Sequence, residues 1–158
     1  MAGPIVDASL IKHQGQWWMF YALEGPDKRA MRELHVASAA NLTGPWTPHP
    51  QNPVAKGFET SRPGGTPFVH EGALYLPVQD CSSTYGAAVT LLQIEQLAHF
   101  AAKAARKLHP GELKTSFTDG LHTVSACGDV TLFDVKHTER SPKRALINLQ
   151  RRWRRLTR

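Results

Sequence analysis

Three stretches of the chain repeat one order of hydrophobic and polar positions. Each opens with turn-forming residues, continues with an apolar, β-prone run, turns at a glycine and ends with a second run of aromatic and aliphatic residues. The turn glycines are Gly15, Gly72 and Gly128, at a spacing of about 57 residues. Glycine tolerates the positive φ that tight hairpin turns require. The pattern therefore predicts three β-hairpins.

Further elements are predicted between these hairpins. Residues 32–38 and 87–94 are β-prone runs that follow the first and second hairpins. Residues 93–108 have apolar positions at helical spacing and many alanines, which favour helix. We therefore predict three or four short antiparallel strands in each unit, and a surface helix between the second and third units.

A strand-built period of this length is typical of a β-propeller, whose blades pack face to face around an axis. We predict an all-β domain over residues 1–139, with units near 4–57, 61–110 and 117–138. The alternative is an unrelated sandwich with coincidental glycines. About three blades are too few to close a propeller. A closed propeller would therefore need either further blades from a longer protein or the self-association of several copies. The first is favoured because the chain starts just before a blade. If neither holds, the repeat interpretation is wrong.

The basic charge of the chain lies in its last residues. The net charge is +6, but residues 140–158 hold eight Lys and Arg and no acid, so residues 1–139 are slightly acidic. Leucines and Trp153 recur there at spacings of three and four residues, which predicts a basic amphipathic helix. This tail could dock on the body or contact an anionic membrane or partner. Nucleic acid is the remaining alternative, and we expect no specific nucleic-acid partner.

Length and composition restrict the class of protein further. The 158 residues suit one globular domain. The sequence has no apolar run long enough to cross a membrane and no signal-peptide pattern, so we expect a soluble, cytoplasmic protein. Its two cysteines, Cys81 and Cys127, form no CxxC pair and are expected to be reduced structural thiols. We expect neither a metal nor a cofactor.

Five sequence strings resemble one known family, in the same order along the chain. They are VDAS followed by GQWWMFY, then LTGPWTPHPQNPV, SRPGG, QDCSSTYG and DGLHT. The pattern resembles the N-terminal-like propeller domain of glucosamine inositolphosphorylceramide transferase. That domain is similar to the five-bladed arabinanase, levansucrase and invertase group, which includes glycoside hydrolase family 43. The resemblance implies a five-bladed fold, of which this chain is a C-terminal fragment lacking two blades, and an association with glycan synthesis or processing.

The repeat also predicts where polar side chains meet. The opening strand of each blade begins near the mouth of the central channel, so the residues that open the units converge there. A carboxylate, a guanidinium and an imidazole at one mouth would suit a sugar or sugar phosphate. The predicted ligand-binding residues are Asp7, Arg62, Gln79, Asp80, Tyr85 and His122. The candidate catalytic carboxylates are Asp7, Asp80 and Asp119, because glycoside hydrolysis generally uses two carboxyl groups.

Each candidate also has a purely structural interpretation. Asp7 and Asp119 could cap turns, Arg62 could be a solvated loop charge, and His122 could be a buried structural histidine. Aromatic residues more typical of a core than of a sugar platform are Trp18, Tyr21 and Tyr75.

The leading functional hypothesis is a glycan-associated module that binds a carbohydrate or sugar phosphate. The alternative is a glycosidase or glycosyltransferase-associated enzyme domain, active only with its missing blades. In the related hydrolases the general base opens the first blade, which this chain would lack. The sequence contains no GxGxxG, P-loop or DxD motif that would hold a nucleotide sugar. We therefore expect no activity from this chain alone.

Overall fold

The chain forms three antiparallel β units that follow one another in sequence. The structure is a computed structural model that describes residues 3–138 and residue 153. The first unit contains β1 (Ile5–His13), β2 (Gln16–Leu23), α1 (Arg29–Arg32), β3 (Glu33–Ala39), β4 (Thr47–Pro48) and β5 (Ala55–Lys56). The second contains β6 (Arg62–Pro63), β7 (Phe68–His70), β8 (Ala73–Asp80), β9 (Ala88–Gln96) and β10 (Ala101–Leu108). A 3-10 turn over Pro110–Glu112 leads to the third, β11 (Gly120–Cys127) and β12 (Val130–Lys136).

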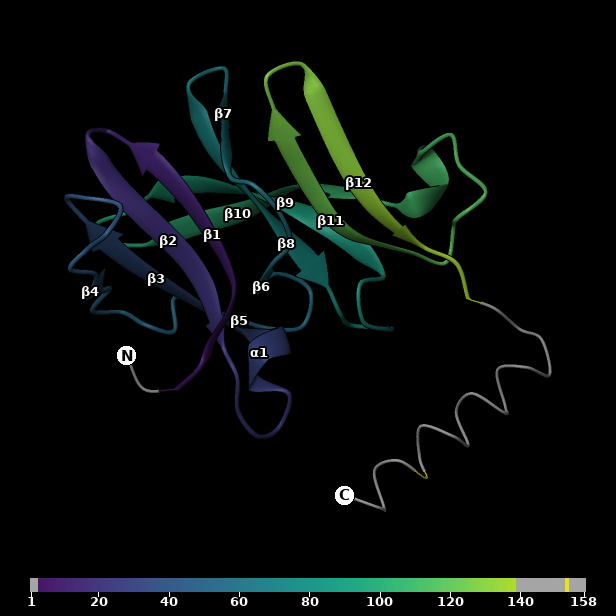
Figure 1. Cartoon of the computed structure of the whole chain (residues 1–158), viewed down its shortest axis with the longest axis horizontal. Helices are drawn as coiled ribbons and strands as arrows, with labels where there is room; N and C mark the ends of the chain where they lie inside the picture. The colour runs from purple at the N-terminus through teal and green to yellow at the C-terminus, as the bar shows by residue number, and fades with distance from the viewer. Residues whose placement is uncertain (1–2, 139–152, 154–158) are drawn as a thin grey trace.

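The strands of each unit are joined in chain order. In the first unit the order is β1-β2-β3-β4, with β5 also paired to β3, and in the second it is β10-β9-β8-β6, with β7 paired to β8. The three predicted hairpins are confirmed as β1-β2, β7-β8 and β11-β12. Their turn glycines have φ values of 80° at Gly15, 76° at Gly72 and 57° at Gly128. Figure 1 shows the three units side by side with these turns at one end, called here the turn end.

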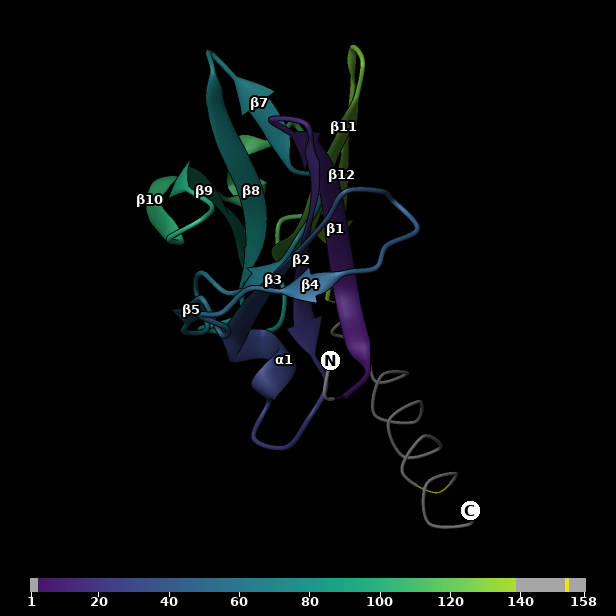
Figure 2. The same ribbon diagram turned by 90° about the vertical axis from the view of Figure 1, so that its left-hand side faces the viewer.

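The first two units pack through a core that alternation along the strands predicts. Phe20, Leu34 and Val36 of the first unit meet alternate residues of β8 and β9. These partners are Leu74, Leu76, Val78, Leu92 and Ile94, all less than a tenth exposed. Alternate residues of a strand point to opposite faces, so one face of each sheet supplies this core. Figure 2 shows β8 between the first unit and the outer strand β10.

The opposite face of the second unit packs against the third. Val89 of β9 joins Leu121 and Val124 of β11 in a smaller buried cluster. The backbones also meet directly, because the amide of Val124 donates to the carbonyl of Gly64 at 2.8 Å. A Cβ on Gly65 would lie 1.7 Å from the carbonyl oxygen of Val124, so this approach requires glycine. Both the fold class, all-β, and the face-to-face contact of successive units follow from these sheets.

The helix predicted over residues 93–108 is wrong. That stretch forms the end of β9, a turn and strand β10, which pairs antiparallel with β9 from Ala101 opposite Gln96 to Leu108 opposite Val89. Leu92 and Ile94 enter the core between the first two units, while Val89 enters the core with the third. Burial on both faces of β9 outweighs the weak helix preference of the alanines.

The predicted basic helix over residues 140–158 lies outside the described residues, apart from residue 153. Within the described part of the chain, no helix has the length and apolar character needed to span a membrane.

Candidate functional site

Five of the predicted ligand-binding side chains meet in one network, at the end of the units opposite the turn end. They come from all three units and are Asp7 of β1, Arg62 of β6, Gln79 of β8, Tyr85 of the β8-β9 loop and His122 of β11. The repeat explains why these side chains lie together, because the first strand of every unit begins at this same end.

Asp7 and Arg62 join the first unit to the second. The Nε of Arg62 donates to Oδ2 of Asp7 at 2.5 Å, and the Nε2 of Gln79 lies 3.4 Å from the same oxygen. Asp7 has φ 52° and lies where the register of β1 and β2 shifts. Gln79 is 1% exposed and also donates to the carbonyl of Pro63 at 3.0 Å. The alternative that Arg62 is a solvated loop charge is therefore wrong, since its side chain is only 13% exposed.

Tyr85 and His122 join the second unit to the third. The hydroxyl of Tyr85 lies 2.6 Å from Nε2 of His122, and Nδ1 of His122 lies 3.1 Å from Oδ2 of Asp134. A carboxylate only accepts hydrogen bonds, so Nδ1 carries a proton, and in the neutral ring Nε2 accepts from the phenol. The guanidinium carbon of Arg62 lies 5.2 Å from the centre of the Tyr85 ring, within cation–π range. This contact connects the two halves of the network.

Two participants were missed by the sequence analysis. Asp134 orients His122, and the ammonium of Lys136 donates to the backbone carbonyl of Tyr85 at 2.8 Å. Both lie on β12, opposite the first residues of β11. Counting back along the hairpin from the turn at Gly128 places residue 134 opposite 123, so the register was an available signal for Asp134. Lys136 lies opposite Gly120 only because the register shifts between Leu121 and Thr123, which the count does not predict.

Glycines bring the second and third units close enough for these contacts. A Cβ on Gly86 would lie 2.9 Å from Cδ2 of His122. A Cβ on Gly120 would lie 2.4 Å from the carbonyl oxygen of Gly86. Larger residues at either position would separate Tyr85 from His122.

Burial governs the chemistry of the neighbouring phenol and thiol. Partial burial raises the pKa of Tyr85 above its ordinary value, so the phenol stays protonated and donates. Burial likewise raises the pKa of Cys81, whose thiol lies 3.9 Å from Oε1 of Gln79. The expectation that Cys81 is a buried structural thiol is confirmed, whereas Cys127 is exposed at the turn end. A protonated, buried thiol is a poor nucleophile.

The two remaining acidic candidates have local partners. Asp80 is 5% exposed and accepts from the ammonium of Lys107 at 2.8 Å and from the amide and hydroxyl of Ser82. Burial alone would raise the pKa of Asp80, but the hydrogen bonds from Lys107 and Ser82 outweigh it, so this pKa is lowered. Asp119 accepts from the backbone amide of Thr138 at 2.6 Å and lies 3.4 Å from Nδ1 of His137.

Two of the three aromatic residues assigned to the core lie in it or against it. Tyr21 is 2% exposed, and Trp18 packs against the core between the first two units. Tyr75 stacks on Phe68 with ring centres 5.4 Å apart. Within residues 3–138, no group of three or more His, Cys, Asp or Glu side chains is arranged to hold a metal ion.

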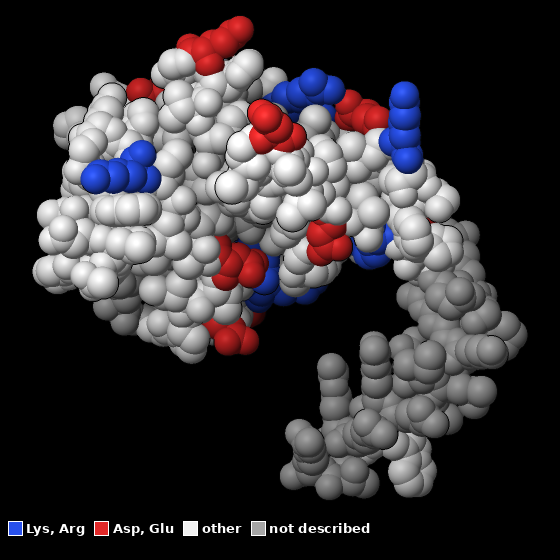
Figure 3. Space-filling model, turned by 45° about the horizontal axis from the view of Figure 1, so that its top comes forward, with Lys and Arg blue, Asp and Glu red and all other residues white. Residues whose placement is uncertain are grey.

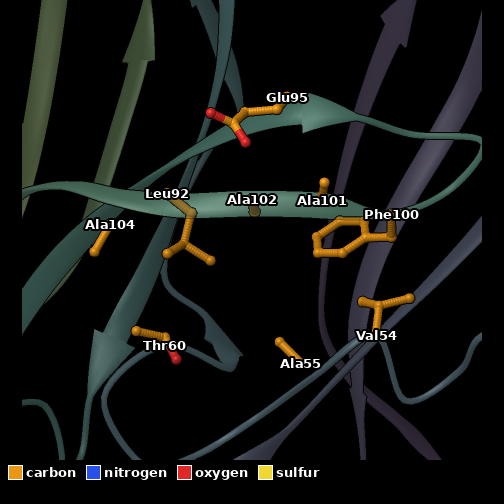
Figure 4. Close-up of a pocket in the computed structure, with 9 residues that line it drawn as sticks. All are labelled: Val54, Ala55, Thr60, Leu92, Glu95, Phe100, Ala101, Ala102 and Ala104. Atoms are coloured by element: carbon orange, nitrogen blue, oxygen red, sulfur yellow. The ribbon is translucent and has the colours of Figure 1, made fainter.

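The surface also contains pockets away from this network. Figure 4 shows one of about 330 Å³, formed where β9 and β10 face the loop before β6, with Phe100, Leu92 and Val54 around it. Its charged member, Glu95, pairs with Lys103 at 2.7 Å. A larger groove lies at the turn end. Figure 3 shows that end with acidic and basic side chains interspersed among neutral surface.

Comparison with known proteins identifies relatives of the chain. Residues 1–107 match the family described as "Glucosamine inositolphosphorylceramide transferase 1, N-terminal". Two relatives from rice, Oryza sativa subsp. indica and Oryza sativa subsp. japonica, are named glucosamine inositolphosphorylceramide transferase 1. Each is 41% identical to the chain over 99 residues, which are 60% of this chain and 13% of the relative. The chain thus spans a small part of the length of these relatives.

The family match includes part of the network. Asp7, Arg62, Gln79 and Tyr85 lie within the matched residues, whereas His122 lies beyond them. The match extends over more than half of the sequence. The chain therefore belongs to the family of glucosamine inositolphosphorylceramide transferase 1 N-terminal domains.

Proposed function

We propose that this chain is a glycan-associated module that binds a carbohydrate or sugar phosphate at the network of Asp7, Arg62, Gln79, Tyr85 and His122. The observation that carries the proposal is the contact of these side chains across all three units. The module would be part of a five-bladed propeller, completed by further blades or by self-association. The family name supports an association with glycan or sphingolipid synthesis.

The chemistry of the network favours a hydroxylated, anionic ligand. Arg62 uses Nε on Asp7, and guanidinium groups bind phosphate through several donors at once. Asp7 and Tyr85 are exposed and present a carboxylate and a phenol to solvent, groups that suit sugar hydroxyls. Gln79 and the Arg62 side chain are more deeply buried, so they would fix the positions of the exposed groups.

The proposal is tested by titrating the full chain with myo-inositol 1-phosphate and with myo-inositol. We expect the phosphate to bind more tightly, and Arg62→Gln to weaken its binding at least about tenfold, since a charge-assisted hydrogen bond contributes about 1.5–3 kcal/mol. His122→Ala should weaken it less. His70→Ala is the matched control, because His70 is exposed on β7 near the turn end.

Near-ultraviolet circular dichroism shows whether each variant keeps its fold. Unchanged affinity in folded Arg62→Gln and His122→Ala would refute a ligand site at this network. Equal loss in His70→Ala would point to a ligand bound elsewhere.

A second candidate function, acid–base catalysis, is favoured by the hydrogen-bonded chain Tyr85–His122–Asp134. An imidazole oriented by a carboxylate can exchange a proton with a phenol that faces a substrate. The enzyme would be of glycosidase or glycosyltransferase type and would need the remaining blades. In a blade-complete protein, Asp134→Asn should lower kcat/KM and change its pH profile. An unchanged pH profile would refute acid–base catalysis by this chain of residues and leave ligand binding as the only proposed function.

A further inference from the structure

A second groove lies at the turn end, between the first and second units. It has a volume of about 660 Å³, within the usual range of small-molecule sites. Its walls come from the β1-β2, β7-β8 and β9-β10 turns, and its polar lining includes Gln14, Gln16, Gln93, Gln96 and His13. Trp18 with Leu74 and Ile94 supplies the apolar part of the lining.

We propose that this groove binds a neutral carbohydrate, independently of the candidate network at the opposite end. Its four glutamine amides each offer both a donor and an acceptor, the pairing that vicinal sugar hydroxyls satisfy. Trp18, which packs part of its surface against the core, also lines the groove and adds aromatic surface beside them. A hydroxylated, uncharged ligand fits this set of groups.

The charge of the groove argues against an anionic ligand. Among the residues that the structure describes, its lining includes neither Lys nor Arg, and its carboxylate, Glu95, is paired with Lys103 at 2.7 Å. A nucleic acid or sugar phosphate would meet the Glu95 carboxylate there, whose neighbouring cation Lys103 is already paired with it, whereas Arg62 provides a guanidinium at the other network. The two sites therefore differ in the charge of the ligand that each would accept.

Hydrogen bonds between the units fix one wall of the groove in place. Nε2 of His49, in the first unit, lies 3.0 Å from the carbonyl of Leu97 and 3.2 Å from that of Ala98, both in the β9-β10 turn. The side chain of Gln51 accepts from the amide of Phe100 at 2.8 Å. These contacts fix the β9-β10 turn against the first unit, so this wall of the groove is ordered before a ligand binds, which lowers the ordering cost of binding.

Nuclear magnetic resonance of the ¹⁵N-labelled full chain tests the inference, with cellotriose, maltotriose and triacetylchitotriose as neutral probes and glucose 6-phosphate as the charged probe. We expect at least one neutral probe to shift the side-chain signals of the groove glutamines and of Trp18, with a Kd on the order of 1 mM. The double variant Gln16→Ala, Gln96→Ala removes two exposed amides from opposite walls and should weaken binding at least about fivefold. The matched control Asn41→Ala removes an exposed amide outside the groove and should leave binding unchanged.

The inference is overturned if no neutral probe shifts these signals, if the double variant binds as the parent does, or if glucose 6-phosphate binds the groove more tightly than the neutral probes. Shifts confined to Arg62 and His122 would instead support the network alone. Arg62→Gln should leave neutral-probe binding intact, so the two proposals can fail separately.

Discussion

Asp80→Asn should destabilise the chain without removing ligand binding at the network. The carboxylate is 5% exposed, and its Oδ2 accepts from Lys107 while its Oδ1 accepts from Ser82. An asparagine can keep the oxygen that faces Ser82, but it loses the charge and can place an amide donor against the Lys107 ammonium. Asp80 therefore connects the end of β8 with β10, inside one sheet.

The size of the loss follows from the exposure of the two partners. A hydrogen bond to a charged group contributes about 1.5–3 kcal/mol, but the side chain of Lys107 is 36% exposed and partly screened by water. We expect a loss of about 1–2 kcal/mol, or about 3–6 °C in Tm for a chain of this length. Urea denaturation and thermal melting measure both quantities.

The same lysine provides a matched control. Glu59 lies 3.8 Å from Nζ of Lys107, but its side chain is 61% exposed, so Glu59→Gln should leave stability unchanged within about 0.5 kcal/mol. If Asp80→Asn kept full stability and lost binding of myo-inositol 1-phosphate, the structural assignment would be refuted. Asp80 would then belong to the ligand site, as the sequence analysis had placed it.

The pH dependence of this difference has a defined sign. Because the folded-state pKa of Asp80 is lowered, its contribution is fully present above the unfolded value of about 3.9 and disappears as pH falls through the folded value. The pKa of Lys107 is raised, chiefly by its hydrogen bond to Asp80, so its contribution is fully present below about 10.4 and disappears as pH rises through the folded value. The difference between parent and Asp80→Asn should therefore be largest from about pH 5 to pH 9 and should vanish in acid.

Two backbone features give further predictions, both measured by urea denaturation. Gly65→Ala should cost more than about 3 kcal/mol, because the new Cβ would lie 1.7 Å from a carbonyl oxygen of β11, whereas Gly15→Ala, with φ 80° and open space, should cost about 1 kcal/mol. Equal losses would contradict the required close approach. Asn52→Ala should cost about 2 kcal/mol, because its side chain bonds both the amide and the carbonyl of buried Val36 at 2.8 Å. Asn41→Ala, at an exposed position, should change the free energy of unfolding by less than about 0.5 kcal/mol. If it cost as much as Asn52→Ala, the hydrogen bonds of Asn52 to Val36 would not explain the loss.

The hairpins could be predicted because their signals are local. Alternation along each strand and a glycine at each turn specify pairing within about fifteen residues, and Gly15, Gly72 and Gly128 all adopt positive φ. Strand β10 could not be predicted in the same way. Its alanines favour a helix, but the burial of β9 against both neighbouring units makes this stretch part of the sheet. No local sequence pattern contains that information.

The wrong prediction for β10 also hid the salt bridge of Asp80. With residues 93–108 taken as a helix, Lys107 did not belong to the sheet, so its contact with Asp80 could not be predicted. In the structure the β9-β10 pairing places Lys107 opposite Thr90, and its ammonium reaches Asp80. Asp134 was missed because its importance depends on the register of β12 against β11. The meeting of Asp7 and Arg62 could be predicted because each residue lies at the start of a unit, and the repeat defines where each unit starts.

The position of the network implies that binding of the proposed ligand would be coupled to the packing of the units. Asp7 contacts Arg62 and Gln79 across the first junction, while Tyr85 contacts His122 and Lys136 across the second. A ligand that binds only the assembled arrangement stabilises it, by about 2.7 kcal/mol at one hundred times its Kd.

The second junction should respond more to such a ligand. Its core has three buried residues, compared with eight in the first, and the third unit has two strands in the described chain. Less apolar surface is therefore available to hold it in place. A ligand held between Arg62 and His122 would supply what this small core lacks, so the side chains that would recognise the ligand also determine how firmly the third unit packs on the second.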